Sequence, residues 1–208
     1  MHLNQHVLER RLNMAKKEST FINMVYVLFL ISALSGLALG YVYSITKEPI
    51  AAAKKAKIEK AIKEVLPAFD ELSSGYKVFS YDGSKPSDSL VFFDAKKDGK
   101  WVGTAVNTYT MKGFSGLVKL MIGFKPDGTI NKISVLEHKE TPGLGSKMST
   151  PKFIDQFNNQ NPSSFKLTVT KDGGDVDAIT AATISSRAFC DAADRAFKTF
   201  KQNKGGNK

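Results

Sequence analysis

An uncharged, apolar run over residues 21–45 constrains this 208-residue sequence more than any other feature. At a rise of about 1.5 Å per residue, about 20 apolar residues cross the hydrocarbon core of a bilayer, so the run can span it with some tilt. A cleaved secretory signal is the alternative, because Ala38-Leu39-Gly40 could serve as a small-residue cleavage site. The apolar run continues past that site and is longer than a typical signal core, so we predict an N-terminal transmembrane helix.

The basic residues on the two sides of this run disagree about its orientation. Four Lys or Arg residues lie in the polar segment 1–20, whereas six lysines follow the run within residues 47–63. A raw count would place the C-terminal side in the cytoplasm, but long C-terminal domains translocate largely regardless of charge. We therefore expect a single-pass protein of the cell inner membrane, with a cytoplasmic N-terminus and an extracytoplasmic C-terminal domain.

Residues 46–74 are expected to form a lysine-rich helical stalk. Pro49 suits the first turn of a helix over 49–66, and Pro67 would stop it. The apolar residues between them recur at helical spacing and form one face: Ile58, Ala61, Ile62, Val65 and Leu66. The lysines that follow the apolar run therefore lie near the membrane, where each lysine beside anionic lipid contributes about 1 kcal/mol. This placement favours membrane lipid, and not nucleic acid, as the partner of the basic residues.

Residues 75–200 form the predicted working domain, in which strands come first and helices follow. The expected strands cover 76–81, 89–94, 100–110, 116–124 and 130–137, and the expected helices cover 149–158 and 183–201. This order indicates an α+β fold with a mainly antiparallel sheet and flanking helices. The polar tail 201–208 is expected to be disordered.

The sequence has few side chains that could bind a metal ion, and this limits the redox cofactors that it could hold. The sequence holds one cysteine and three histidines, too few for a disulfide within the chain, an iron–sulfur cluster or a His-rich metal site. We therefore expect no metal site, and any redox chemistry would come from an organic cofactor.

The segment DAITAATISS, at residues 177–186, leads into the last predicted helix. Small residues surround Thr180 and Thr183 in it. Unpaired N–H groups and the helix dipole make such an end a natural phosphate site, and small side chains let a ligand approach the backbone. Ordinary N-capping by either threonine is the alternative.

A second segment, HKETPGLG at residues 138–145, follows a predicted strand. Pro142 and Gly143 fit the central positions of a type II turn, and the proline pushes Thr141 into an extended conformation. Such a loop could bring backbone N–H groups and Leu144 against a flat ligand. An ordinary surface turn between a strand and a helix is the alternative.

Together, in this order and behind a membrane helix, these segments resemble the covalent FMN-binding family. Its members include the G subunit of the Rnf electron-transport complex and the C subunit of the sodium-pumping NADH:quinone oxidoreductase. The family motif is an Asp, two spacers, Ser/Thr-Gly-Ala-Thr, one spacer and Ser/Thr. Here it reads Asp177, Thr180-Ala181-Ala182-Thr183 and Ser185. The loop ETPGLG at 140–145 matches in full, and GFSG at 113–116 is also similar.

The resemblance implies that Thr183 carries FMN through a phosphoester on its hydroxyl, installed by a separate flavin transferase that uses FAD and Mg²⁺. The phosphate would lie at the N-terminus of the last helix, and the loop 140–145 would pack on the isoalloxazine ring, with Glu140 and Thr141 near the ring edge. Lys147 could contact the phosphate or the ring, and a solvated surface lysine is the alternative. The expected cofactor-binding set is Thr183, Thr180, Ala181, Ala182, Asp177, Ser185, Glu140, Thr141, Gly143, Leu144, Gly145 and Lys147.

One departure from the family motif is Ala181, which replaces the usual glycine and is strained if that position needs a positive φ. By resemblance, the chain is an electron-carrying subunit of an Rnf-type complex that couples electron transfer between ferredoxin and NAD⁺ to Na⁺ or H⁺ transport. Its partners would be polytopic membrane subunits and iron–sulfur subunits, and no residue of its own is expected to be catalytic. One alternative is the C subunit of the sodium-pumping NADH:quinone oxidoreductase, although such subunits are generally longer than this chain. A non-redox, membrane-anchored binding or assembly protein on the same fold is the other.

Overall fold

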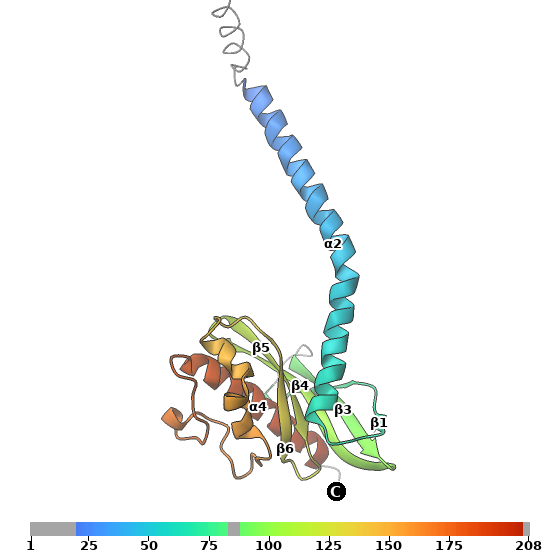
Figure 1. Ribbon diagram of the computed structural model, residues 1–208, viewed down its shortest axis with the longest axis vertical. Coiled ribbons are helices and arrows are strands. Elements are labelled where there is room, and N and C mark those ends of the chain that lie inside the picture. Colours follow the sequence, from blue (N-terminus) through green and yellow to red (C-terminus); the bar gives the residue numbers. More distant parts are fainter. Residues whose placement is uncertain (1–19, 83–87, 206–208) are drawn as a thin grey trace, which may run out of the picture. The chain divides into compact units, whose positions relative to one another are not determined.

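The computed structural model describes residues 20–82 and 88–205. The chain divides into two compact units, Met1–Ala53 and Lys54–Lys208. One helix, α2 (Phe21–Val65), begins in the first unit and ends in the second (Figure 1).

In the first unit, α2 presents apolar side chains that nothing in the described chain covers. Its most apolar 18-residue window is 0% buried, unlike the core helix of a soluble protein. Within the described residues, this is the one helix long and apolar enough to cross a membrane. The helix predicted over 21–45 is therefore present, with the length and composition that a membrane span requires.

The helix predicted over 49–66 is also present, but its expected start is wrong. Pro49 lies inside α2, which continues without a break to Val65. Proline removes one backbone donor from a helix, but residues on both sides keep their own hydrogen bonds, and adding a residue to an existing helix is easier than nucleating a new one.

The second unit is built on one antiparallel sheet, which confirms the predicted α+β class. Its strands are β1 (Glu71–Leu72), β2 (Tyr76–Phe79), β3 (Ser89–Lys97), β4 (Lys100–Gly113), β5 (Gly116–Phe124) and β6 (Ile130–His138). They lie in the order β1-β3-β4-β5-β6, and β2 also pairs with β3. Every pairing is antiparallel. The two-residue strand β1 was not predicted, because a strand this short has no period to detect.

The turn between β3 and β4 has the backbone conformation of a tight hairpin. Asp98 and Gly99 have φ values of 51° and 72°, and the flanking residues Lys97 and Lys100 pair across the hairpin. Positive φ at both central positions is the condition for a type I′ turn, which matches the twist of the strands it joins.

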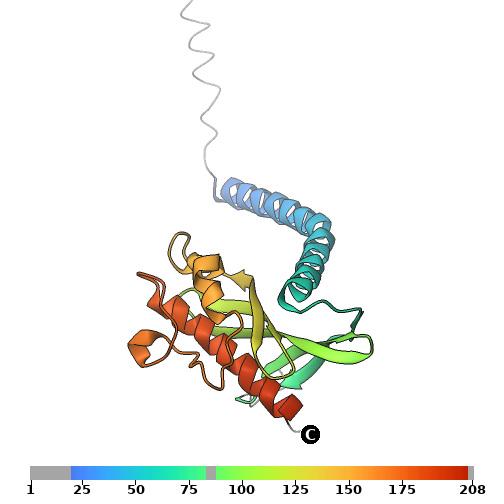
Figure 2. The ribbon, with the colours of Figure 1, turned by 60° about the horizontal axis from the view of Figure 1, so that its bottom comes forward.

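Each face of the sheet is covered by a helix. On one face lies α4 (Thr183–Gly205), which crosses the strands diagonally in Figure 2. Phe200 of α4 stacks on Phe124 of β5, with ring centroids 4.8 Å apart. On the other face, the last turns of α2 pack Ile62 and Val65 into a smaller core with Met121. Two layers of apolar contact therefore hold the sheet in place.

The helical predictions after β6 need two corrections. The expected helix over 149–158 is a series of short turns: η3 (Gly145–Ser149), α3 (Pro151–Ile154) and η4 (Asp155–Phe157). Thr150 is extended because it precedes Pro151, and this interrupts the helix. The predicted disordered tail is helical as far as Gly205, because Lys204 donates to Asp94 Oδ2 at 2.7 Å and ties the last turn to β3. Residues 206–208 of that prediction lie outside the described residues.

Candidate functional site

The two segments singled out in the sequence meet at one cavity of about 320 Å³. The loop after β6 and the first turn of α4 supply most of its walls, and the turn between β4 and β5 supplies the rest. The lining residues are Phe114, Glu140, Thr141, Leu144, Gly145, Ala181, Ala182, Thr183, Ile184 and Ser185. We refer to this space as the attachment cavity, after Thr183, which lines it and which the sequence predicts as the attachment point.

The loop in the attachment cavity has the turn that the sequence predicts. Leu144 N donates to Thr141 O at 3.2 Å, and Gly143 has a φ of 77°. A positive φ at the third position is what a type II turn requires, and glycine adopts it without strain. Ser146 Oγ accepts from Gly143 N at 2.9 Å, which holds the turn against η3.

The first turn of α4 leaves backbone donors available. Ala182 O accepts the first bond of the helix, from Ser186 N at 3.0 Å. The N–H groups of Thr183, Ile184 and Ser185 have no acceptor among the described residues, as expected for a helix N-terminus. Neither Thr180 nor Thr183 makes a side-chain capping bond within the described chain, so the ordinary capping alternative is not observed.

Ala181 has a φ of 60°, so the position does require the left-handed backbone conformation that the family glycine adopts freely. An alanine there pays a steric cost of about 1–2 kcal/mol relative to a right-handed conformation. The departure from the family motif is therefore strained, and the fold tolerates it.

Glu140 is held by protein groups on both of its carboxylate oxygens. The residue is 5% exposed. Its Oε1 accepts from Ser115 N at 3.1 Å, and its Oε2 accepts from Ser185 Oγ at 2.5 Å. Glu140 does line the attachment cavity, but its carboxylate joins three segments of the protein. A contact from this carboxylate to a ring edge would have to compete with those bonds.

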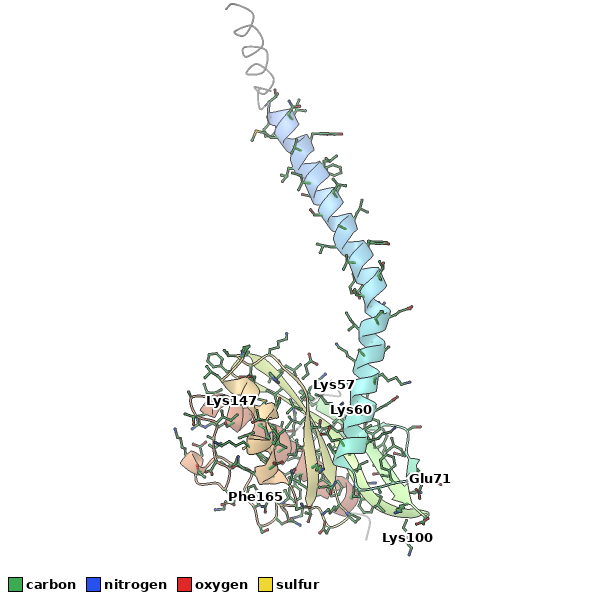
Figure 3. All side chains as sticks on the ribbon, viewed as in Figure 1. Lys57, Lys60, Glu71, Lys100, Lys147 and Phe165 are labelled. Atoms are coloured by element: carbon green, nitrogen blue, oxygen red, sulfur yellow. The ribbon has the colours of Figure 1, made fainter. Side chains whose placement is uncertain are left out.

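Three predicted site residues line a second cavity, of about 550 Å³. Asp177, Thr180 and Lys147 lie there with Phe153 and Gln156. The backbone of Asp177 is fixed by Gln156, whose Oε1 accepts from Asp177 N at 2.7 Å and whose Nε2 donates to Asp177 O at 3.3 Å. Lys147, labelled in Figure 3, is exposed. The predicted set is thus divided between two cavities, and Gly143 lines neither.

Two lining residues were missed in the predicted set. Phe114, at the tip of the β4–β5 hairpin, is 69% exposed, and Ile184, in the first turn of α4, is 48% exposed. The GFSG segment was noted for its similarity to the family, but that similarity assigned no role to its phenylalanine. Exposed apolar side chains around a cavity can cover a flat aromatic ligand.

The attachment cavity fits a phosphate-bearing flat ligand. Its helix N-terminus offers free N–H donors, and Leu144, Phe114 and Ile184 offer apolar walls. Gly145 allows the loop to close on the helix, since a Cβ at this position would lie 2.4 Å from Ser185 Oγ. No group of three or more His, Cys, Asp or Glu residues in the described chain could hold a metal ion.

These features define a class of protein, one with an FMN-binding domain. The model of the family described as "FMN-binding domain" matches residues 113–198, which include the attachment cavity. Among curated proteins, the chain is 30% identical over 188 residues to the G subunit of the ion-translocating oxidoreductase complex of Aliivibrio fischeri, covering 86% of this chain and 89% of that protein. It is 32% identical to the corresponding G subunit of Methanosarcina acetivorans, covering 81% and 88%. The chain belongs to this family, the G subunits of ion-translocating oxidoreductase complexes.

Solved structures are also similar. The crystal structure of NqrC from Shewanella oneidensis has a TM-score of 0.47 and 22% identity, and the match covers 62% of this chain and 70% of that chain. Family membership together with the exposed apolar helix α2 makes this chain a membrane-anchored protein.

Proposed function

We propose that this chain is the electron-carrying flavoprotein subunit of an Rnf-type complex, which couples electron transfer between ferredoxin and NAD⁺ to the translocation of Na⁺ or H⁺. The observation that carries the proposal is the position of Thr183, at a helix N-terminus with free N–H donors and against the ETPGLG loop. The names of the related proteins support the coupling to ion transport.

The proposal includes covalent attachment of FMN to Thr183. The Thr183 side chain is half-buried, lines the attachment cavity and makes no hydrogen bond within the described chain. No histidine lines this cavity, so the chain offers no base of the usual kind to activate the hydroxyl. A separate flavin transferase would therefore act on it. With FAD as donor and Mg²⁺ bound, the Thr183 Oγ1–phosphorus bond forms, the pyrophosphate bond breaks, AMP leaves and the hydroxyl proton is released.

The chain's own residues would position and shield the cofactor. FMN, when bound, supplies the electron-carrying chemistry, and the protein holds and tunes it. The N–H groups of Thr183, Ile184 and Ser185 would hold the phosphate, where the helix dipole favours negative charge. Leu144 and Phe114 would pack on the ring. Lys147 lines the neighbouring cavity and would reach the ribityl chain or the phosphate only from that side.

The proposed setting is the cell inner membrane, with the N-terminus in the cytoplasm and the flavin domain on the extracytoplasmic side. The partners would be polytopic membrane subunits, iron–sulfur subunits, the flavin transferase and membrane lipid. Co-purification with iron–sulfur and polytopic subunits supports Rnf membership, and recovery with quinone-reductase subunits would favour the C-subunit alternative. Protease access to the domain only from the cytoplasmic side of sealed vesicles would contradict the orientation.

The attachment is tested by in-gel flavin fluorescence after denaturation, with the full-length chain produced in a host that has the transferase. We expect a fluorescent wild-type band, a dark Thr183→Ala band and an unchanged Thr168→Ala band. Thr168 is a suitable control because it is an exposed threonine of the same domain that lines neither cavity. A dark wild-type band would contradict the proposal and favour a non-redox assembly protein, the alternative that the strained Ala181 supports.

A further inference from the structure

We propose that Glu140 is a positioning residue, which works with Ser185 to hold Thr183 and the ETPGLG loop in the arrangement that flavin attachment needs. The purpose of this arrangement rests on the proposed function, but the contacts themselves do not. In this role Glu140 acts through the protein and makes no contact with the flavin ring.

The first support is the set of segments that the carboxylate joins. Glu140 belongs to the loop after β6, Ser115 to the turn between β4 and β5, and Ser185 to the first turn of α4. One oxygen accepts from the backbone of Ser115 at 3.1 Å and the other from the hydroxyl of Ser185 at 2.5 Å. Thr183 lies two residues before Ser185, so the same bond fixes the turn that carries the attachment hydroxyl.

The second support is the glycine on each side of the carboxylate. A Cβ at Gly113 would lie 2.6 Å from Glu140 Oε1, and a Cβ at Gly145 would lie 2.7 Å from Glu140 Oε2. Real Cβ atoms do not come this close to other heavy atoms. A Cβ would also lie 2.4 Å from Gly116 O at Gly113 and 2.4 Å from Ser185 Oγ at Gly145, so both positions need a glycine, and at both the backbone packs directly on this one carboxylate.

The third support is the charge around Glu140. Glu140 is 5% exposed as a residue, and its carboxylate makes no ion pair with any Lys, Arg or His of the described chain. It lies at the N-terminus of α4, where the helix dipole favours an anion. Glu140 bonds to the side chain of Ser185 and leaves the backbone N–H groups of the first turn free. The carboxylate thus orders the helix end without occupying the donors that a phosphate would use.

A carboxylate buried in this way depends on each of its hydrogen bonds, because losing one leaves a buried group unsatisfied. The test uses the full-length chain with Glu140→Gln, Ser185→Ala and the double substitution. Glu137→Gln is the matched control, since Glu137 is a neighbouring glutamate on β6 whose side chain is 41% exposed. The first measurement is amide hydrogen exchange in the flavin-free chain. The backbone amides within residues 113–116 and 141–147 should exchange at least about tenfold faster in both single variants than in the wild type.

Coupling between the two residues is the second expectation. Because Glu140 and Ser185 share one bond, the double variant should exchange no faster than the faster single variant. The control variant should exchange like the wild type. Unchanged exchange in both single variants, or effects that simply add, would overturn the proposal that the Glu140–Ser185 hydrogen bond holds these segments together.

The next measurement asks whether the Glu140–Ser185 hydrogen bond promotes the attachment of FMN to Thr183. With the chain as substrate of the flavin transferase, both single variants should lower kcat at least about tenfold while the KM for FAD stays the same, since a misplaced hydroxyl slows the transfer and not the binding of FAD. A wild-type kcat in both variants would overturn the positioning role. Failure of the wild-type chain to take up flavin would instead overturn the proposed function, whatever the exchange data show.

Discussion

Ala181 offers the sharpest test of the backbone geometry at the site, because a single methyl group separates it from the family's usual glycine. Its φ of 60° places the residue in the left-handed region. There the Cβ of an L-residue crowds the following carbonyl oxygen, and glycine has no such contact. We therefore expect Ala181→Gly to stabilise the domain, which is an unusual direction for an alanine-to-glycine change.

The expected change in the free energy of unfolding is the difference between two opposing contributions. Relief of the left-handed conformation is worth about 1–2 kcal/mol. The greater freedom of glycine in the unfolded chain offsets about 0.4–1 kcal/mol of that gain. The central values of the two contributions differ by about 0.8 kcal/mol, a net stabilisation that raises the midpoint of thermal unfolding by about 2–3 °C in a unit of this size.

The assay is thermal unfolding of the full-length chain, followed by the fluorescence of Trp101. This is the only tryptophan of the sequence, and its Nε1 donates to Gly103 O at 2.9 Å within β4, so it reports on the sheet. Ala182→Gly is the matched control, because Ala182 is buried and has no positive φ. It should lose about 1–2 kcal/mol through the added flexibility and the lost methyl burial. A midpoint for Ala181→Gly that stays the same or falls would refute the inference of strain.

Two further expectations concern groups outside the site. Burial tends to raise the pKa of Asp94, but hydrogen bonds from Lys204, Thr104 and Tyr76 outweigh it and hold that pKa below its ordinary value. The carboxylate therefore contributes stability above the unfolded pKa of about 4, and this stability is lost as the pH falls through the lower folded pKa. In urea unfolding, Asp94→Asn should lose less stability in acid than the wild type does. An unchanged dependence of stability on pH would contradict this. Burial raises the pKa of the Cys190 thiol to about 12, so a thiol reagent at a pH of about 8 should label this cysteine only after denaturation. Rapid labelling of the folded chain would show that α4 opens locally.

Much of the fold could be predicted because its signals are local. Alternating apolar residues and turn pairs such as Asp98-Gly99 specify strands and hairpins over a few positions, and the apolar stripe of the last helix repeats every turn. The predictions failed where a distant contact decides the outcome. The last turn of α4 is helical because Lys204 reaches Asp94 on β3, and this pairing has no local signature.

The structure brings the two predicted segments together, but it distributes the individual predicted residues differently from the expectation. The motif singled out two stretches of the sequence, and the structure brings both of them to the attachment cavity. It could not identify Phe114, since an aromatic residue in a turn can equally pack against its own hairpin or face solvent. Nor could it show that Asp177 and Thr180 face a different cavity from Thr183, because that depends on how the chain bends at Ala181.

The sequence by itself determined the membrane helix, the succession of strands along the chain and the threonine that we propose carries the flavin, because hydrophobic periods and motif spacing are properties of neighbouring residues. Only the tertiary structure decided what Glu140 does. Its partner Ser185 lies 45 positions away along the chain, and their hydrogen bond exists only after the sheet and α4 have packed together. A buried carboxylate takes its role from the donors that the fold brings to it, and no local pattern specifies those donors.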